Sequence, residues 1–376
     1  MGIIYNEKAK TFTLHTQNTT YQMQIDAYGF LLHLYYGRKT DGVMDYLLTY
    51  ADRGFSGNPQ DTGNDRTYSL DVLPQEFPCR LTGDFRSPVL DLVNADGSFG
   101  CDLRYQGYEI CDGKYNLKGL PAVYAAEEEA QTLIIYMKDQ VTGLQVELLY
   151  GVLPEYDVIT RSAKVINTEE DKIRLTKAQA ACIDFLHGEF DVISFYGRHA
   201  MERNMQRTSV GHGAFVIGSR RGTSSHQYNP MLILAEKETT EDAGICYGMS
   251  FVYSGGFKAE VEKDQFGQTR MQMGLQEEQF FYPLKKGEEF VIPEVILTCS
   301  NQGLEKLSQN LQRCIRKNLC RGKYKEKVRP VLINSWEACY FDFTGEDIYH
   351  LAEQAKDLGI DMVVLDDGWF GSRNDD

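Results

Sequence analysis

Hydrophobic and polar residues alternate along short segments through the first 300 residues of the chain. The alternation is visible in residues 11–15, 21–25, 144–150, 158–166 and 289–292. Successive side chains of a β-strand point to opposite faces, so this pattern predicts strands with at least one buried face. Gly, Asn, Asp and Pro separate the segments, and helical periodicity is scarce. We therefore predict a large antiparallel β-sandwich domain over residues 1–300.

The pattern changes after residue 300. Leu304, Leu307 and Leu311 fall at helical spacing, which predicts an amphipathic helix that continues toward Leu319. Either Ser300 or Asn301 is expected to cap it. Basic residues follow the apolar positions and extend to residue 329, which is typical of a solvated helix end. Residues 301–328 are thus predicted to form a helical linker.

Residues 329–376 have the pattern of a β-strand, a helix and a second β-strand. Residues 330–334 and 361–365 are short apolar segments, and between them Thr344 precedes an amphipathic segment that stops before Gly359. Two apolar strands that flank one helix are typical of a parallel sheet. A closed barrel typically takes about 250 residues. The segment is therefore expected to be either the incomplete start of a barrel or a small βαβ appendage.

Composition narrows the classes of function. The 376 residues carry a formal net charge of −15, which disfavours nucleic acid and anionic membranes as partners and favours a neutral substrate. No apolar segment approaches the roughly 18 residues of a membrane span, and the first residues lack the apolar core of a signal peptide. Nine scattered cysteines without a Cys-x-x-Cys pair predict free thiols in the cytoplasm and no metal cluster.

The residues that best suit chemistry follow the two predicted parallel strands. Both tryptophans of the chain, Trp336 and Trp369, lie there, as does the pair Asp366 and Asp367. The carboxyl ends of parallel strands form the active-site face of α/β folds. Carboxylates accept hydrogen bonds from sugar hydroxyls, and an indole offers an apolar plate to a pyranose. Alternative interpretations are a divalent-cation site or a loop cap.

Specific motifs resemble glycoside hydrolase family 36, the α-galactosidases or melibiases. Residues 329–338 and 365–371 are similar to the start of that family's catalytic barrel. Motifs similar to those of its large β-domain occupy residues 65–76, 197–204, 221–230 and 253–257. The resemblance implies a mainly β chain, with an N-terminal antiparallel β-supersandwich followed by the first βαβ unit of a (β/α)8 barrel in residues 329–376.

The resemblance also implies an activity. The family hydrolyses terminal α-linked galactose in melibiose, raffinose and stachyose by a retaining double displacement, without a cofactor. Carried over by position, Asp366 and Asp367 bind galactose hydroxyls and Trp336 lines the pocket. In the family's bacterial tetramers, an N-terminal loop reaches a neighbour's active site, and its candidates here are Asp52, Arg53 and Arg66. A homo-oligomer, namely a tetramer when complete, is therefore expected.

The family's nucleophile and acid/base are later aspartates that lie beyond the C-terminus of these 376 residues. Adjacent residues such as Asp366 and Asp367 do not fit those two roles, because retaining glycosidases place their carboxyls about 5–5.5 Å apart across the bond. We therefore expect no catalytic residue within the chain and no hydrolysis by the chain alone. The alternative is a non-catalytic β-sandwich module for sugar binding or oligomerisation.

Overall fold

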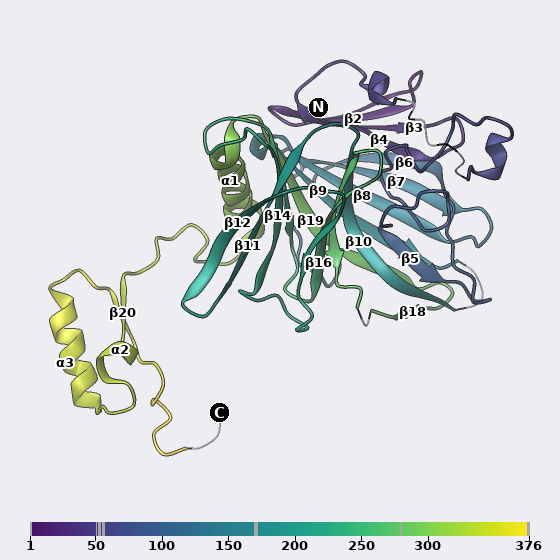
Figure 1. The fold of residues 1–376 in the computed structure, drawn as a ribbon. Helices are drawn as coiled ribbons and strands as arrows, with labels where there is room; N and C mark the ends of the chain where they lie inside the picture. The colour runs from purple at the N-terminus through teal and green to yellow at the C-terminus, as the bar shows by residue number, and fades with distance from the viewer. Residues whose placement is uncertain are drawn as a thin grey trace. The chain divides into compact units, whose positions relative to one another are not determined.

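The computed structural model describes residues 2–49, 51, 54, 57–168, 172–278 and 280–373. The chain forms two compact units, Met1–Leu319 and Cys320–Asp376 (Figure 1). The first is built almost entirely of β-strands, and the second contains the βαβ segment. The division falls inside the segment 301–328, after the helix that begins this segment and packs on the sheets.

In the part of the chain that the structure describes, three antiparallel sheets make up the first unit. A four-stranded sheet has the order β1 (Ile3–Asn6), β2 (Thr11–His15), β3 (Thr19–Ile25) and β4 (Leu31–Arg38). The nine-stranded sheet has the order β12 (Met201–Ser209), β11 (Phe190–Arg198), β14 (Tyr228–Glu236), β15 (Cys246–Phe251), β19 (Glu289–Ser300), β9 (Val158–Ile166), β8 (Gln145–Leu153), β7 (Gln131–Asp139) and β6 (Leu103–Asp112). The third sheet has the order β13 (Gly213–Gly218), β16 (Phe257–Lys263), β17 (Thr269–Leu275), β10 (Ile173–Phe185) and β18 (Tyr282–Leu284), and β5 (Leu90–Val93) also pairs with β10. This confirms the predicted antiparallel sandwich.

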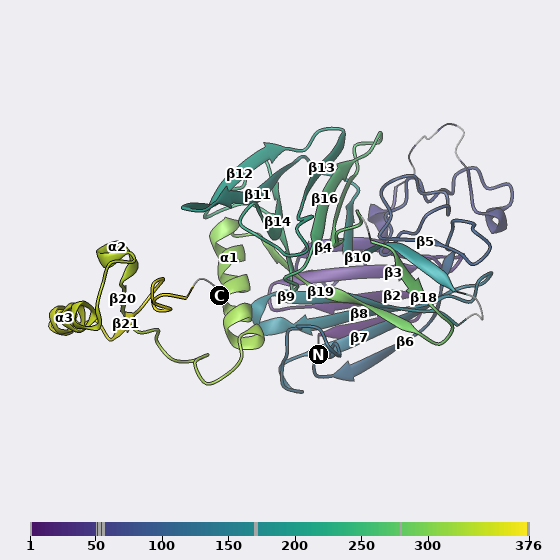
Figure 2. The ribbon, with the colours of Figure 1, turned by 90° about the horizontal axis from the view of Figure 1, so that it is seen from below.

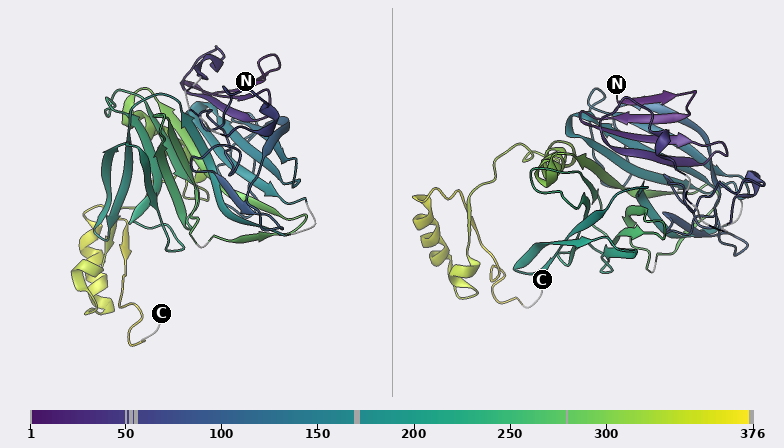
Figure 3. Two further views of the ribbon diagram at one scale, coloured as in Figure 1. Left: turned by 45° about the vertical axis from the view of Figure 1, so that its right-hand side comes forward. Right: turned by 45° about the horizontal axis from the view of Figure 1, so that its top comes forward.

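The main core lies between the nine-stranded sheet and the two smaller sheets. The four-stranded sheet approaches β7 and β19, and the six-stranded sheet approaches β9, β15 and β19 (Figures 2 and 3). Fully buried side chains of all three sheets meet there, among them Phe12, Leu148 and Met271. Hydrophobic and polar residues thus alternate along a strand because only one of its faces meets the main core, as expected from the sequence.

Helix α1 (Gly303–Cys314) covers the opposite face of the nine-stranded sheet and continues as a π-helical turn, Ile315–Leu319. Its buried Leu307 and Leu311 pack against strand residues such as Ile296. In β19, therefore, Val295 and Leu297 face the main core while Ile296 faces the helix. This explains why β19 is apolar at consecutive positions instead of strictly alternating.

The predicted cap of this helix is wrong. The N-cap position is Gln302, which makes no side-chain capping bond, and Ser300 instead accepts a hydrogen bond from the Gln302 amide. The first helical N–H groups donate to backbone carbonyls of the turn between β14 and β15, at Thr240, Glu241 and Gly244. Tertiary contact thus replaces the side-chain cap that helix ends otherwise need.

A buried carboxylate links two of the sheets. Glu76 is fully buried and accepts hydrogen bonds from the hydroxyls of Tyr21 in β3 and Tyr150 in β8, at 2.7 and 2.9 Å. The guanidinium of Arg161 in β9 pairs with the same carboxylate, and His33 lies 3.2 Å from it. Because a buried charge is tolerated only when it is paired, these contacts fix how the two sheets meet.

A second buried group of charges holds the irregular segment that precedes β5. Arg270 in β17 donates two hydrogen bonds of 2.7 Å to Asp184 in β10 and a third of 2.7 Å to Asp84. Arg86 completes the group by donating to Asp84 at 2.9 Å. All four side chains are almost fully buried. Burial would raise the pKa of Asp184, but Arg270 and Arg86 outweigh it and hold this pKa at about 2.

Among its described residues, the second unit contains one parallel strand pair and two helices. Strands β20 (Leu332–Asn334) and β21 (Met362–Val364) pair in parallel, with Leu332 opposite Met362, as predicted. Between them lie α2 (Trp336–Cys339) and α3 (Gly345–Lys356). Thr344 caps α3 as expected and exchanges hydrogen bonds with Asp347 in a capping box. Ala355 is the one buried residue of this helix.

No helix within the described residues is both long enough and apolar enough to pass through a lipid bilayer.

We predict that acid destabilises the first unit through Asp184. Its pKa is about 2 in the folded protein and near the ordinary 3.8 in the unfolded chain. The folded state therefore binds fewer protons between these values, and stability falls as the pH drops from about 4 to about 2. The free energy of unfolding should fall by about 2 kcal/mol over this range. Urea unfolding at a series of pH values measures this change. Asp184→Asn should make the free energy of unfolding less dependent on pH in this range. Asp41→Asn, at an exposed position, should leave the pH dependence unchanged. An unaltered acid dependence in the first variant would contradict the assignment.

We predict that the two units differ in amide hydrogen exchange. Strands β8, β9 and β19 have both faces largely buried, whereas β20 and β21 contain no buried residue. Amides in residues 332–364 should therefore exchange at least about 100-fold faster than those of the three core strands. Mass spectrometry of peptic fragments measures both in one sample. Equal protection of the two units would refute the prediction.

Candidate functional site

A polar corner forms where β20 and β21 end. Asn334 is the last residue of β20, and its Nδ2 donates a hydrogen bond of 2.6 Å to Oδ2 of Asp366, two residues after β21. The Asp366 amide donates to the hydroxyl of Ser335 at 3.1 Å, and Ser335 is fully buried. The parallel register brings these residues together, because it places the carboxyl ends of both strands side by side.

The two predicted aspartates have different environments. Asp366 is half-buried, and its Oδ1 accepts a hydrogen bond of 2.8 Å from the amide of Asp367. Each oxygen of Asp366 thus has one protein partner, which leaves acceptor positions open because a carboxylate has about four. The Asp367 side chain is exposed, and it makes no hydrogen bond or ion pair with any residue that the structure describes. The corner can therefore accept several hydroxyl hydrogen bonds.

Trp336 is held at the same corner by Asn334. The Trp336 amide donates to Oδ1 of Asn334 at 2.7 Å, so one side-chain amide bridges the tryptophan backbone and Asp366. The indole packs edge-on against Tyr340 and Phe341, with ring centroids 5.2 and 4.9 Å apart. A cleft of about 770 Å³ lies among residues 338–344 and Asp347, next to these rings.

Trp369 has different neighbours. Its indole is 62% exposed, lies 5.9 Å from the ring of Phe370 and is covered by the guanidinium of Arg373 at 4.9 Å. Within the described residues it makes no ring contact with Trp336. Gly368, just before it, has φ of +93° and passes close to Phe343, where a Cβ would lie 2.9 Å from the ring. The structure thus connects Trp336 to Asp366 through Asn334. The Trp369 ring instead packs against Phe370 and Arg373.

The candidates from the N-terminal loop belong to the first unit. Asp52 and Arg53 lie outside the described residues. Arg66 is exposed and follows a 3-10 turn, Gln60–Thr62. The assignment of all three to a neighbour's site remains a prediction.

Sequence reasoning missed Asn334 and Ser335 as site residues. Both stand at the carboxyl end of a predicted strand, which is the signal that selected Asp366. Their roles come from the register of a parallel pair, because only the pairing shows that position 334 faces position 366. As for metals, the described part of the chain contains no group of three or more His, Cys, Asp or Glu side chains arranged to bind an ion.

Comparison with known proteins identifies the family. Residues 29–285 match the Glycosyl hydrolase family 36 N-terminal domain, and residues 289–376 match the Melibiase family. The chain belongs to glycosyl hydrolase family 36.

Several characterised relatives align over the whole chain. The bifunctional alpha-galactosidase/sucrose kinase AgaSK of Mediterraneibacter gnavus is 63% identical over 376 residues, which cover 40% of its length. Alpha-galactosidase Mel36A of Lactobacillus acidophilus is 43% identical, and the match covers 51% of it. The chain thus spans about half the length, or less, of these relatives and corresponds to their N-terminal part.

Solved structures show the same fold. The galactosidase domain of AgaSK superposes with a TM-score of 0.95, covering 99% of this chain and 52% of that one at 63% identity. A variant of the alpha-galactosidase AgaA of Geobacillus stearothermophilus, solved in complex with raffinose, superposes with a TM-score of 0.93 at 42% identity. That match covers 97% of this chain and 51% of the AgaA chain.

Proposed function

We propose that the chain is part of an enzyme that hydrolyses terminal non-reducing α-D-galactosyl residues in α-galactosides such as melibiose and raffinose. The observation that carries the proposal is the corner in which Asn334 fixes both Asp366 and Trp336, at the strand ends where α/β enzymes bind substrate. Two facts about relatives support it. They are named alpha-galactosidases, and variants of AgaA have been solved with raffinose and with stachyose.

The corner suits a neutral sugar. Asp366 is oriented by Asn334 and by the Asp367 amide, so its remaining acceptor positions point in fixed directions. Two hydroxyl groups of galactose would donate to Asp366 and Asp367, and the Trp336 indole would cover an apolar face of the ring. No charge on the ligand is required, which agrees with an acidic chain that disfavours anions.

The bond-breaking groups are proposed to come from elsewhere. A retaining double displacement needs a nucleophile and an acid/base on either side of the glycosidic bond. Asp366 already accepts two hydrogen bonds from its own corner, and Asp367 is its immediate neighbour in the chain. We assign both to binding and place the two catalytic carboxylates in the half of the relatives that this chain does not match.

Assembly and location complete the proposal. The whole enzyme is proposed to be a cytoplasmic homotetramer in which Asp52, Arg53 and Arg66 of one subunit approach the active site of a neighbour. Buried thiols such as Cys182 and Cys299 suit a reducing compartment, which supports the cytoplasmic location. No cofactor is proposed, because glycosidic hydrolysis by two carboxylates needs none.

The 376-residue polypeptide by itself should hydrolyse no α-galactoside. Loss of either carboxylate of a double displacement removes most of the rate, and here both are proposed to be missing. Release of p-nitrophenol from p-nitrophenyl α-galactoside by the purified chain measures this. The control is a preparation from cells that lack the gene. Turnover above that control would overturn the proposed division of roles.

A chimaera tests the binding roles. In it, this chain replaces the matching N-terminal part of AgaSK, and kcat/KM for p-nitrophenyl α-galactoside is measured. Asp366→Ala and Asp367→Ala should each lower kcat/KM by about 10- to 100-fold, the value of one hydrogen bond to a charged group. Asn334→Ala should lower it as well, since Asp366 then loses its orienting partner. Asp357→Asn, an exposed carboxylate at the end of α3, is the matched control. Equal activity of the Asp366 variant and this control would contradict the proposal.

A further inference from the structure

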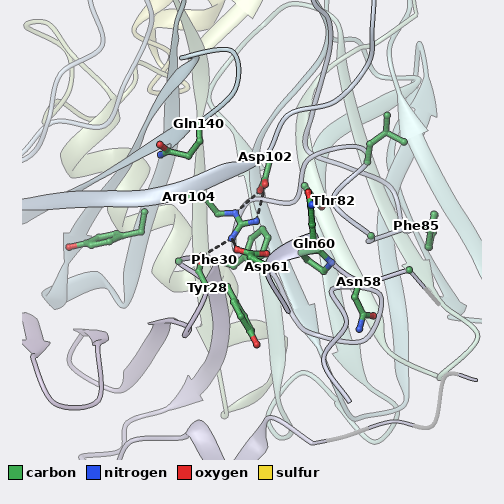
Figure 4. A pocket seen from close by; sticks show the side chains of 16 residues that line it. Tyr28, Phe30, Asn58, Gln60, Asp61, Thr82, Phe85, Asp102, Arg104 and Gln140 are labelled. Atoms are coloured by element: carbon green, nitrogen blue, oxygen red, sulfur yellow. Dashed lines mark hydrogen bonds and ion pairs between the residues drawn. The ribbon is translucent and has the colours of Figure 1, made fainter. Parts of the chain in front are cut away.

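A second cavity lies wholly within the first unit. It has a volume of about 1020 Å³, at the upper end of the range for small-molecule sites. The loop between β3 and β4, the start of β6, the turn after β7 and two irregular segments (57–61 and 81–85) line it. Figure 4 shows Arg104 in the centre of the view, with Gln140 and Phe85 to either side. None of these residues is used by the corner at Asp366.

One arginine and two aspartates form a hydrogen-bonded group in the lining of the cavity. The Arg104 guanidinium donates two hydrogen bonds to Asp102, at 2.6 and 2.8 Å, and one to Asp61 at 2.9 Å. It also donates to the Tyr28 carbonyl at 2.6 Å and lies 3.8 Å from the ring centroid of Phe30. Four of its five N–H groups are thus engaged, and its side chain is only 13% exposed.

The two carboxylates still face solvent. The side chains of Asp61 and Asp102 are 50% and 47% exposed, although each is paired with Arg104. Each oxygen that accepts from Arg104 keeps a further acceptor position. The cavity therefore offers hydrogen-bond acceptors held by Arg104 and a net charge of −1, while the guanidinium has little capacity left for an anion.

The segment 81–85 carries two exposed apolar residues of the lining and is anchored at one end by buried ion pairs. Phe85 is 73% exposed, yet its neighbours Asp84 and Arg86 are buried in the ionic group with Asp184. Leu81, at the other end of the same segment, is 67% exposed and has φ of +67°. A left-handed backbone is costly for a branched residue, and such strain persists only where the surroundings impose it. The fold thus anchors the segment that carries two exposed apolar residues, and both line the same cavity as the carboxylates.

We propose that this cavity binds a neutral oligosaccharide. Hydroxyl groups of the sugar would donate to Asp61 and Asp102, and Phe85 would cover an apolar sugar face. Anionic ligands are disfavoured because the lining contains two carboxylates and one occupied guanidinium. The proposal rests on these contacts alone and does not depend on the α-galactosidase assignment. It describes a binding subsite on the β-domain, built from none of the residues of the corner at Asp366.

Raffinose, a neutral trisaccharide, is the probe, and isothermal titration calorimetry is the measurement. The starting protein is the full chain with Asp366→Asn and Asp367→Asn, so that the corner cannot contribute. We expect saturable binding that Phe85→Ala weakens by at least about fivefold, the effect of one aromatic contact. Asp61→Asn should weaken it similarly. Phe281→Ala is the matched control, because Phe281 is also 59% exposed but does not line the cavity.

Each other result overturns the proposal. Binding that disappears in the starting protein belongs to the corner, which leaves the proposed function intact and removes this subsite. Equal weakening by the Phe85 and Phe281 variants, or an absence of saturable binding, excludes the cavity. Binding of spermidine in place of raffinose would show a site for cations. If sedimentation velocity shows instead that Phe85→Ala dissociates an oligomer without changing raffinose binding, the cavity is a contact between copies of the chain.

Discussion

A carboxylate inside an apolar core must be neutralised where it lies, and Glu76 imposes this constraint on the β-domain. Its partners come from β3, β8 and β9, so the four-stranded and nine-stranded sheets must meet in one arrangement for Tyr21, Tyr150 and Arg161 to reach it. Asp184 in β10 imposes the same constraint, because its partners Arg270 and Arg86 lie in β17 and in the segment before β5. Apolar packing makes the sandwich stable, whereas a packing that separated these buried charges from their partners would be strongly disfavoured.

The alternation of side chains predicted the strands well where one face meets the core. The prediction for residues 11–15 matches β2, and that for residues 158–166 matches β9. It failed to give the full length of β19, because α1 covers the second face, so that apolar residues occupy consecutive positions over 295–297. The order of the strands and the cap of α1 depend on contacts between distant segments, such as the turn at Thr240, which no local pattern encodes.

At the candidate site, the sequence identified side chains of suitable chemistry, but it did not show which of them are joined by hydrogen bonds. Asp366 and Trp336 were selected because they follow apolar strands, and the structure joins them through one residue, Asn334. That residue has no distinctive chemistry by itself, and its role arises from the parallel register. Trp369 was grouped with them on the same signal, yet its ring is packed by Arg373. Proximity in sequence predicted the region of the site, whereas hydrogen-bond geometry defined its members.

The connection from β19 to α1 depends on a residue that has no side chain. Gly303 has φ of +78°, and a Cβ there would collide with the backbone carbonyl of Glu241. This permits the turn after β14 to press directly on the first turn of α1 and to accept its amide hydrogens. The start of α1 is thereby fixed against the turn after β14 by backbone hydrogen bonds. Any larger residue at this position would force either this turn or the first turn of α1 to move, and the hydrogen bonds between them would be lost.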